Sequence, residues 1–484
     1  MKNPGHNWSE ITADLNKMVN TDFVIEDRES VKPYECDGLS VYREMPRIVV
    51  IPETTAEVSS VLRYCHERLI PVVTRGAGTG LSAGAMPLAD GIVLSMAKFT
   101  QILEIDPESR IARVECGVRN LAISEAARPY GLFYAPDPSS QIACTIGGNV
   151  AENSGGVHCL KYGLTVHNVL EAKLLTAEGE PVTLGSASLD DCGMDLLALL
   201  IGSEGLLGVV TELTVKLLPR PEAARVVLAA FDDVQLAGDA VARIISEGII
   251  PAGLEMMDQL AIIAAEDFVH ADYPTEAEAM LLCELDGSVE EVEEYTARIE
   301  KLMQEIGAVS VRVSRSDAEL ELLWKGRKSA FPAIGRISPD YYCMDGTIPR
   351  GQLAFVLKKM QSLSEAFGLR VANVFHAGDG NLHPLILFDE SVPGELDKAE
   401  AFGAAILELC VEVGGCLTGE HGVGLEKIRQ MPLQFSENEL CQMGLIKEAF
   451  DEAGILNPGK GIPILKRCQE YRSIAPAPAG PVAG

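Results

Sequence analysis

Three glycine-rich segments, each placed next to a β-prone run, constrain the fold of the first half of the chain. The first, VTRGAGTGLSAGA, spans residues 73–85. The second occupies residues 136–163, and the third, IGSEGLLGVV, spans residues 201–210. Glycine lets a backbone adopt positive φ and approach a ligand without a Cβ in the way, and backbone N–H groups bind phosphates. We therefore expect the three loops to line one groove for a long ligand such as a dinucleotide.

The glycine pattern differs from the common nucleotide-binding motifs. Residues 78–83 fit the G-x-G-x-x-A pattern of Rossmann folds, which requires a helix directly after the loop. Gly84 and Pro87 interrupt any such helix, and the chain contains no Walker A pattern. A single cluster of this kind would be a turn-rich loop. Because three such clusters occur in one region, we favour a ligand-binding groove over three unrelated turns.

Charge and cysteine usage limit the partners of the protein. Forty basic and seventy acidic side chains give a formal net charge of −30, a surface that repels phosphate backbones, so we expect no nucleic-acid partner. The twelve cysteines include no CxxC pair, which disfavours zinc ribbons and iron–sulfur clusters bound by this chain. The N-terminal residues lack the apolar core of a secretory signal, and no apolar run reaches the length of a membrane span. We therefore expect a cytoplasmic protein with mostly reduced cysteines.

Composition and periodicity divide the chain into successive parts. Residues 46–222 alternate short β-prone runs with amphipathic segments and carry the glycine loops, and residues 1–45 form an extension joined to this part. Residues 223–413 begin with two β-α-β units in succession, which predict a ferredoxin-like α+β layer. Residues 414–466 return to glycine-rich loops and end with a helical pattern, and we expect them to close on the first part. Residues 467–484 are rich in Pro, Ala and Gly, and we expect a disordered tail.

Two short segments in the second half gather histidines and carboxylates. His376 and His383 flank the hairpin-type turn AGDGNL, and Glu420 and His421 lie together in another glycine-flanked loop. Two imidazoles and a carboxylate can bind a divalent metal with open coordination positions. Single histidines are common on surfaces and in cores, but this grouping favours a site. The same groups could activate water in a metal-dependent hydrolase, although a hydrolase gives no use for the glycine loops.

Taken in order along the chain, these motifs resemble those of the vanillyl-alcohol oxidase/p-cresol methylhydroxylase flavoprotein superfamily. The matching motifs are RGAGTG at 75–80, GGN at 147–149, NSGG at 153–156, YG at 162–163 and GLLG at 205–208. The resemblance implies an α+β protein with a two-subdomain FAD-binding fold of the vanillyl-alcohol oxidase type. It also implies that the ferredoxin-like α+β domain is the substrate, or cap, domain.

The resemblance further implies which residues bind FAD, with the first loop holding the pyrophosphate through backbone N–H groups. The residues are Arg75, Gly76, Gly78, Thr79, Gly80, Pro138, Thr145, Gly148, Asn149, Ser154, Gly155, Tyr162, Gly163, Gly205, Val209 and Asn457. Some members of the superfamily attach the flavin covalently through a histidine, and the first loop contains none. We interpret His158, the nearest candidate, as a packing or hydrogen-bonding residue and expect non-covalent FAD.

Within the superfamily, the histidine segments are similar to those of the D-2-hydroxyacid dehydrogenase group. The similarity implies that His376, His383 and Glu420 bind a divalent metal, which could be zinc, iron or manganese. It implies that His421 takes the substrate's hydroxyl proton while a hydride passes to the flavin. Arg327, at the end of a helix-like segment, matches the arginine that grips the substrate carboxylate with two hydrogen bonds.

Lys328 and Arg336, near Arg327, are interpreted as solvated charges. The stretch YYCMDG lacks the lysine with which members that oxidise D-2-hydroxyglutarate hold a second carboxylate, which argues against a five-carbon diacid. GRISPDYYCMDGTIPR and HAGDGNLHPLILFD are most similar to the glycolate-oxidising members, which implies oxidation of glycolate to glyoxylate. A D-lactate dehydrogenase that acts alone, forming pyruvate, and a flavin-free hydrolase are the alternatives.

The similarity to the glycolate-oxidising members also implies partners. It predicts a complex with a second flavin-domain-like subunit and an iron–sulfur subunit, which would receive the electrons. Such partners would hold the protein at the periphery of the inner membrane.

Overall fold

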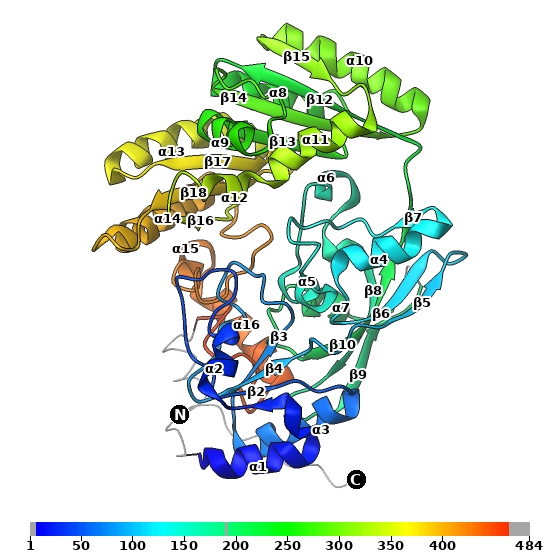
Figure 1. Ribbon diagram of the computed structural model, residues 1–484, viewed down its shortest axis with the longest axis vertical. Coiled ribbons are helices and arrows are strands. Elements are labelled where there is room, and N and C mark those ends of the chain that lie inside the picture. The colour runs from blue at the N-terminus through cyan, green and yellow to red at the C-terminus, as the bar shows by residue number, and fades with distance from the viewer. Residues whose placement is uncertain (1–5, 189–191, 464–484) are drawn as a thin grey trace.

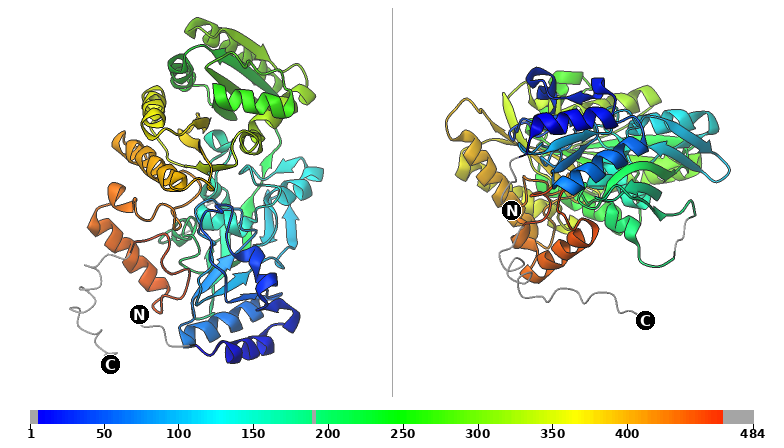
Figure 2. Two further views of the ribbon diagram at one scale, coloured as in Figure 1. Left: turned by 60° about the vertical axis from the view of Figure 1, so that its left-hand side comes forward. Right: turned by 90° about the horizontal axis from the view of Figure 1, so that it is seen from below.

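The computed structural model describes residues 6–188 and 192–463 of the chain. A four-stranded, a five-stranded and a two-stranded sheet with their helices form one half of the molecule, and one seven-stranded sheet with its helices forms the other (Figure 1, Figure 2). The predicted tail, residues 467–484, lies outside the described residues.

A four-stranded sheet opens the first half. Its strands are β1 (Val24–Ile25), β2 (Ile48–Val50), β3 (Val72–Arg75) and β4 (Ile92–Ser95), and the helices of this part are α1 (Trp8–Met18), α2 (Arg28–Val31) and α3 (Thr55–Arg68). The order is β1-β2-β4-β3, in which β2, β4 and β3 run parallel. Helix α3 crosses from β2 to β3 and begins with a capping box formed by Thr54 and Glu57. Strands β2 and β4 are apolar and buried at nearly every position, as is typical of parallel sheets covered on both faces.

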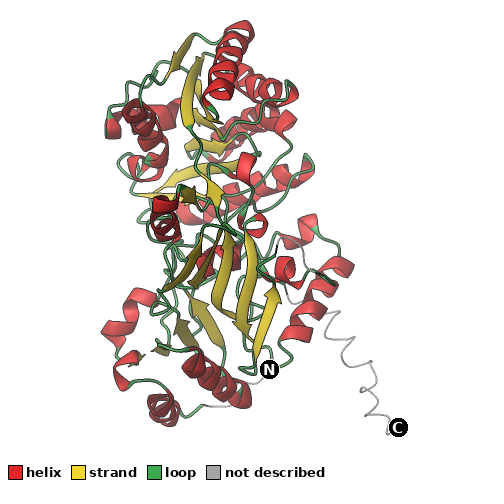
Figure 3. Cartoon of the chain, turned by 90° about the vertical axis from the view of Figure 1, so that its right-hand side faces the viewer, coloured by secondary structure: helices red, strands yellow, loops and turns green. Residues whose placement is uncertain are grey.

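A five-stranded antiparallel sheet follows (Figure 3). Its strands, in the order β5-β6-β10-β8-β9, are β5 (Ile102–Asp106), β6 (Ile111–Glu115), β10 (Val209–Lys216), β8 (Val169–Leu175) and β9 (Pro181–Gly185). Helices α4 (Asn120–Ala127), α5 (Ile146–Glu152) and α7 (Leu196–Leu200) pack against it, α6 (Cys159–Tyr162) follows α5, and β7 (Leu132–Phe133) pairs with β11 (Leu218–Pro219). Buried side chains at Val209, Thr211 and Leu213 of β10 follow the two-residue period of a strand, and Thr214 and Val215, where the register shifts, are both buried.

A seven-stranded antiparallel sheet forms the second half. Its strands are β12 (Ala223–Phe231), β13 (Gly253–Asp258), β14 (Ala279–Gly287), β15 (Ser310–Val313), β16 (Asp340–Cys343), β17 (Val371–His376) and β18 (Asn381–Phe388). In the order β15-β12-β14-β13-β17-β18-β16, the first four strands have the ferredoxin-like arrangement predicted from the two β-α-β units. The last three strands extend the sheet beyond that prediction. They are attached through the antiparallel pairing of β13 with β17, in which Glu255 lies opposite His376, 121 positions later.

Helices cover both faces of the large sheet. Helices α8 (Val234–Ser246), α10 (Val289–Ile306), α13 (Leu353–Phe367) and α14 (Glu395–Glu412) pack on one face, and α9 (Gln259–Val269), α11 (Asp317–Lys328) and α12 (Ala330–Ile334) pack on the other. Strand β12 shows why both faces are covered, because its side chains alternate between two apolar layers. Val227, Ala229 and Phe231 face the first layer, whereas Val226 and Leu228 face the second.

The chain then returns to the four-stranded sheet. Helices α15 (Met431–Gln434) and α16 (Glu437–Phe450) follow the loop that carries Glu420. Beyond α16, Leu456 pairs in parallel with Val72, and the N–H of Asn457 donates to the Val72 carbonyl at 2.8 Å. This segment therefore lies beside β3, next to the first glycine loop.

Candidate functional site

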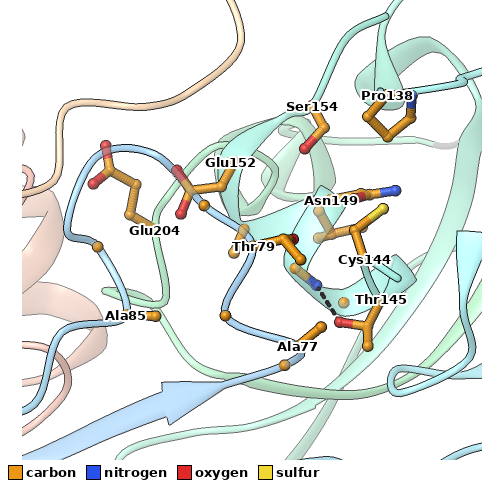
Figure 4. Close-up of a pocket in the computed structure, with 18 of the residues that line it drawn as sticks. Ala77, Thr79, Ala85, Pro138, Cys144, Thr145, Asn149, Glu152, Ser154 and Glu204 are labelled. Atoms are coloured by element: carbon orange, nitrogen blue, oxygen red, sulfur yellow. Dashed lines mark hydrogen bonds between the residues drawn. The ribbon is translucent and has the colours of Figure 1, made fainter. Parts of the chain in front are cut away.

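One cavity of about 250 Å³ is lined by all three glycine-rich loops and by Phe331 and His383 from the second half. The predicted cofactor residues that line it are Gly76, Gly78, Thr79, Gly80, Pro138, Thr145, Gly148, Asn149, Ser154 and Gly205. Figure 4 shows Ala77 and Thr79 of the first loop close to Cys144 and Thr145 of the second. The structure thus brings together loops that lie more than fifty residues apart in the sequence, and we call this space the central cavity.

The first glycine loop is packed so closely that two of its positions exclude side chains. A Cβ on Gly76 would overlap Oγ1 of Thr145, and one on Gly78, whose φ is +70°, would overlap the guanidinium of Arg75. Arg75 is folded beneath its own loop and donates to the Cys36 carbonyl at 2.7 Å. Arg75 therefore supports the loop from behind, and all four glycines of the loop line the central cavity.

Six of the predicted cofactor residues do not line the central cavity. They are Arg75, Gly155, Tyr162, Gly163, Val209 and Asn457. The hydroxyl of Tyr162 donates to Asp286 Oδ2 at 2.5 Å, and Val209 is a fully buried strand residue. The side-chain amide of Asn457 donates to the carbonyls of Gly84 and Glu204, which joins the first glycine loop to the third.

The hairpin of β17 and β18 places His376 and His383 on one face. Val374 is paired with His383 across the hairpin, and His376, two residues after Val374, points to the same side. The two rings meet edge to face with centroids 4.9 Å apart. Oε1 of Glu420 lies 2.8 Å from Nε2 of His383 and 3.4 Å from Nε2 of His376. The three ligand atoms lie within 4.8 Å of one another, a spacing that fits one divalent cation bound by two nitrogens and one oxygen.

His421 lies in the wall of the central cavity beside these ligands. Its ring is stacked on that of His383, with centroids 5.1 Å apart and planes inclined by 5°. Burial lowers the pKa of His421 to about 4, so the imidazole is neutral at neutral pH. Among the described residues, none forms a hydrogen bond with its buried Nδ1. A neutral imidazole with an unpartnered nitrogen can accept a proton from a bound molecule.

Asp345, which the sequence analysis missed, holds the loop that carries Glu420 and His421. Its fully buried carboxylate accepts hydrogen bonds from Thr418 Oγ1 at 2.5 Å and from the His421 N–H at 2.9 Å, and two further N–H groups of the loop point to it. Asp345 is also close enough to His383 and His421 to form a second potential metal group. Its oxygens are already occupied by the loop, which favours a supporting role. In the sequence, an Asp before a Gly is indistinguishable from a turn residue.

Arg327 and Glu255 form a buried ion pair behind His376. Arg327 lies near the end of α11, as predicted, and its Nη2 lies 2.6 Å from Oε2 of Glu255. Burial acts to raise the pKa of Glu255, but the charges of His376 and Arg327 hold that pKa below its usual value, so the carboxylate is ionised. Arg327 does not line the central cavity. No motif in the sequence marks Glu255, and its one signal is that an acidic residue stands inside the apolar strand GLEMM.

Two further glutamates, the buried Glu204 and the half-buried Glu152, lie between the loops and were also missed. Glu204 accepts the N–H groups of Val423 at 2.7 Å and Gly424 at 2.6 Å, which fastens the loop after His421 to the third glycine loop. Glu152 lines the central cavity (Figure 4), and burial together with the charge of Glu204 raises its pKa well above the usual value. The sequence carried one signal of these two residues, because an acidic residue stands inside each of the glycine-containing motifs AENSGG and GSEG.

A second cavity, of about 300 Å³, adjoins the histidine cluster. His376 and Glu420 line it together with Gly155, Gly163 and Arg350. Because Glu420 also lines the central cavity, its carboxylate belongs to the walls of both.

Two protein families match the chain. Residues 46–185 match the family described as FAD binding domain, and residues 220–461 match the family described as FAD linked oxidases, C-terminal domain. The glycolate oxidase subunit GlcD of Escherichia coli (strain K12) is 61% identical over 448 residues, which cover 93% of this chain and 90% of that protein. A D-lactate dehydrogenase of Archaeoglobus fulgidus is 35% identical over 415 residues, covering 85% of this chain and 90% of that protein.

The solved structure of p-cresol methylhydroxylase with substrate bound has a TM-score of 0.80 with this chain at 16% identity, and the match covers 94% of this chain and 96% of that one. Fold and family matches together define a flavoprotein with the predicted FAD-binding fold of the vanillyl-alcohol oxidase type. The chain belongs to the FAD-linked oxidases. It is an enzyme of the oxidoreductase class, and the superfamily indicated by its motifs is confirmed. Within the described ranges, none of the helices combines the length and apolar character needed to cross a bilayer.

Proposed function

We propose that the protein oxidises a small 2-hydroxy acid, glycolate first of all, to the corresponding 2-oxo acid with FAD as cofactor. One observation carries the proposal. His383, Glu420 and His421 lie in the wall of the same cavity as the three glycine loops. A flavin held by the loops and a cation held by the histidines would therefore face one substrate.

The glycine loops fit FAD. Side chains are excluded at Gly76 and Gly78, so the first loop offers its backbone to the central cavity, and such concave backbone segments bind phosphate groups. The position of His158 supports the proposal that the flavin is not covalently attached. Its Nδ1 lies 2.9 Å from Oδ2 of Asp137, and it does not line the central cavity.

The histidine cluster fits a divalent cation. His376, His383 and Glu420 would supply three ligands and leave positions open for a substrate hydroxyl, and zinc, iron and manganese all accept this donor set. Bound FAD would supply a hydride acceptor, and the bound cation would acidify the substrate's α-hydroxyl. His421 removes the hydroxyl proton as the C–H bond gives up its hydride. One proton and one hydride leave the substrate, and its carbinol carbon becomes a carbonyl carbon.

Arg327 is proposed to bind the substrate carboxylate. Its buried Nε has no hydrogen-bond partner among the described residues, so a donor is available for an anion. A guanidinium can hold a carboxylate with two parallel hydrogen bonds. Because Arg327 does not line the central cavity, this role implies that its side chain turns toward the cavity when the substrate binds.

The electrons are proposed to leave through partner subunits. The Escherichia coli relative is named as a subunit of a glycolate oxidase. The cysteines of this chain include no CxxC pair, so an iron–sulfur cluster would be carried by a partner. We infer a second flavin-domain-like subunit and an iron–sulfur subunit, which would hold a cytoplasmic protein at the inner membrane.

D-lactate is the second candidate substrate, since the Archaeoglobus fulgidus relative is a D-lactate dehydrogenase. A dehydrogenase that acts without partners remains the corresponding alternative. The flavin-free hydrolase loses its support, because residues 46–185 match an FAD-binding family.

Steady-state oxidation with an artificial electron acceptor tests the proposal. We expect kcat/KM to be highest for glycolate, next for D-lactate, and low for D-2-hydroxyglutarate, because YYCMDG offers no lysine for a second carboxylate. Purified protein that carries flavin and metal but oxidises none of the three acids would overturn it.

A further inference from the structure

Glu255 is a buried acidic residue of β13 that contacts two residues of the proposed site. Its exposed fraction is 1%, its Oε1 lies 2.8 Å from Nδ1 of His376, and its Oε2 lies 2.6 Å from Nη2 of Arg327. Each carboxylate oxygen therefore has its own partner. We propose that Glu255 is a positioning residue that orients the metal ligand His376 and compensates the charge of the substrate-binding arginine until the substrate arrives. This inference rests on the roles proposed above for His376 and Arg327.

The contact with His376 sets which ring nitrogen carries the proton. A histidine that binds a metal through Nε2 must keep its proton on Nδ1, and a carboxylate at Nδ1 favours that tautomer. Nε2 of His376 is the nitrogen that lies toward Glu420, at 3.4 Å from its Oε1. Glu255 and His376 are direct partners in the register of β13 and β17, so the sheet itself fixes this contact.

The contact with Arg327 compensates a buried positive charge. Arg327 is 1% exposed, and Glu255 is the one carboxylate paired with its guanidinium within the part of the chain that the structure describes. Removing one member of a buried ion pair leaves the other charge uncompensated and free to seek a new partner. One carboxylate thus supports both the metal ligand and the substrate cation, and its loss should affect both.

The neighbouring strand supplies a matched control. Glu284 of β14 is also buried and lies opposite Gly253, two residues before Glu255, so both glutamates share a face of the sheet. Glu284 contacts the indole N–H of Trp324 and lies 3.4 Å from Nε2 of His158, but it contacts no proposed metal ligand.

The test compares Glu255→Gln with Glu284→Gln in the FAD-loaded protein. Zn²⁺ affinity is measured by competition with a chelator, and kcat and KM for glycolate are measured separately at saturating Zn²⁺. For Glu255→Gln we expect Zn²⁺ binding to weaken by about 10–100-fold, the usual effect of losing a hydrogen-bond partner of a metal ligand. We expect FAD content to stay unchanged, added Zn²⁺ to restore part of kcat, and KM to stay raised. Glu284→Gln should match the wild type in Zn²⁺ affinity and KM.

Wild-type Zn²⁺ affinity in Glu255→Gln would overturn the role toward His376, and a wild-type KM at saturating Zn²⁺ would overturn the link to Arg327. A wild-type protein that binds no divalent cation would contradict the proposed function instead, so the two failures are distinguishable. If Glu255→Gln does not fold, Glu255→Asp decides. Its shorter side chain keeps the charge but cannot keep both contacts, so wild-type values for both affinity and KM would overturn the proposal.

Discussion

Replacing Asp345 with Asn tests whether one buried carboxylate holds the loop that carries Glu420 and His421. Asparagine has the shape of aspartate without its charge, and its amide nitrogen donates where the carboxylate accepted. Four donors converge on Asp345, at distances between 2.5 and 3.3 Å. They are Thr418 Oγ1 and the N–H groups of Gly419, Glu420 and His421. All four reach Oδ2, and of the two carboxylate oxygens Thr418, Gly419 and His421 contact only that one, so in the variant these three donors face a neutral amide.

The expected change in the free energy of opening the loop follows from the replacement of a charged acceptor by a neutral one. A hydrogen bond to a charged group contributes about 1.5–3 kcal/mol and one to a neutral group about 0.5–1.5 kcal/mol, so each of the three bonds made to Oδ2 alone weakens by about 1 kcal/mol. The free energy of opening the loop should therefore fall by about 3 kcal/mol, which corresponds to about a hundredfold in the opening equilibrium.

Hydrogen exchange read by mass spectrometry on peptides covering residues 416–424 measures this opening directly. We expect about a hundredfold faster exchange in Asp345→Asn, because opening governs exchange, together with weaker retention of divalent metal and unchanged FAD content. Asp258→Asn is the control, because this half-buried aspartate of β13 accepts from Asn373 and Ala261 and not from the loop. Unchanged exchange in Asp345→Asn, or the same change in both variants, would refute the reasoning.

Three further experiments test other parts of the site and the fold. Gly76→Val should give folded protein without FAD, because the new side chain would overlap Thr145. Gly444→Ala is the control and should keep FAD, because a Cβ at Gly444 meets open space. The measurement is flavin absorbance per mole of purified protein. His421→Ala should keep metal and FAD but slow substrate oxidation by about 10²–10⁴-fold. Glu420→Gln should lose metal and activity together, and added metal should restore part of the activity. Complete loss of metal from His421→Ala would make His421 a ligand. Burial raises the pKa of Asp258 to about 6, so the folded protein holds this proton more tightly than the unfolded chain does. The contribution of Asp258 to the free energy of unfolding should therefore be present at pH 4 and fall by about 3 kcal/mol as the pH rises through 6. Urea midpoints between pH 4 and 8 should show this decline in the wild type and a smaller one in Asp258→Asn; equal slopes would remove Asp258 as its source.

Local sequence patterns predicted those parts of the fold whose contacts are local. Strand and helix periods gave the two β-α-β units, and Asp379 and Gly380 lie in the predicted turn between β17 and β18. The hairpin turn placed His376 and His383 together because its geometry depends on adjacent residues. The convergence of the glycine loops could be predicted because several similar loops occurred in one region.

The missed features depend on contacts between distant segments. Glu255 meets His376 across 121 positions, and Asp345 meets Thr418 across 73. A buried carboxylate leaves no periodic pattern in the sequence, and its role is visible only when its partner is known. For the same reason the three strands added to the ferredoxin-like sheet, β16 to β18, could not be assigned to it from their own residues.

The central claim is that glycolate gives its hydride to FAD beside His421. Adding glycolate to metal-loaded protein without oxygen or any other acceptor tests it directly, because the visible absorbance of bound flavin reports its oxidation state. We predict that the flavin of the wild-type protein bleaches, and that the flavin of His421→Ala bleaches far more slowly at equal FAD and metal content. Flavin that stays oxidised in fully loaded wild-type protein, with glycolate and D-lactate alike, would contradict the claim.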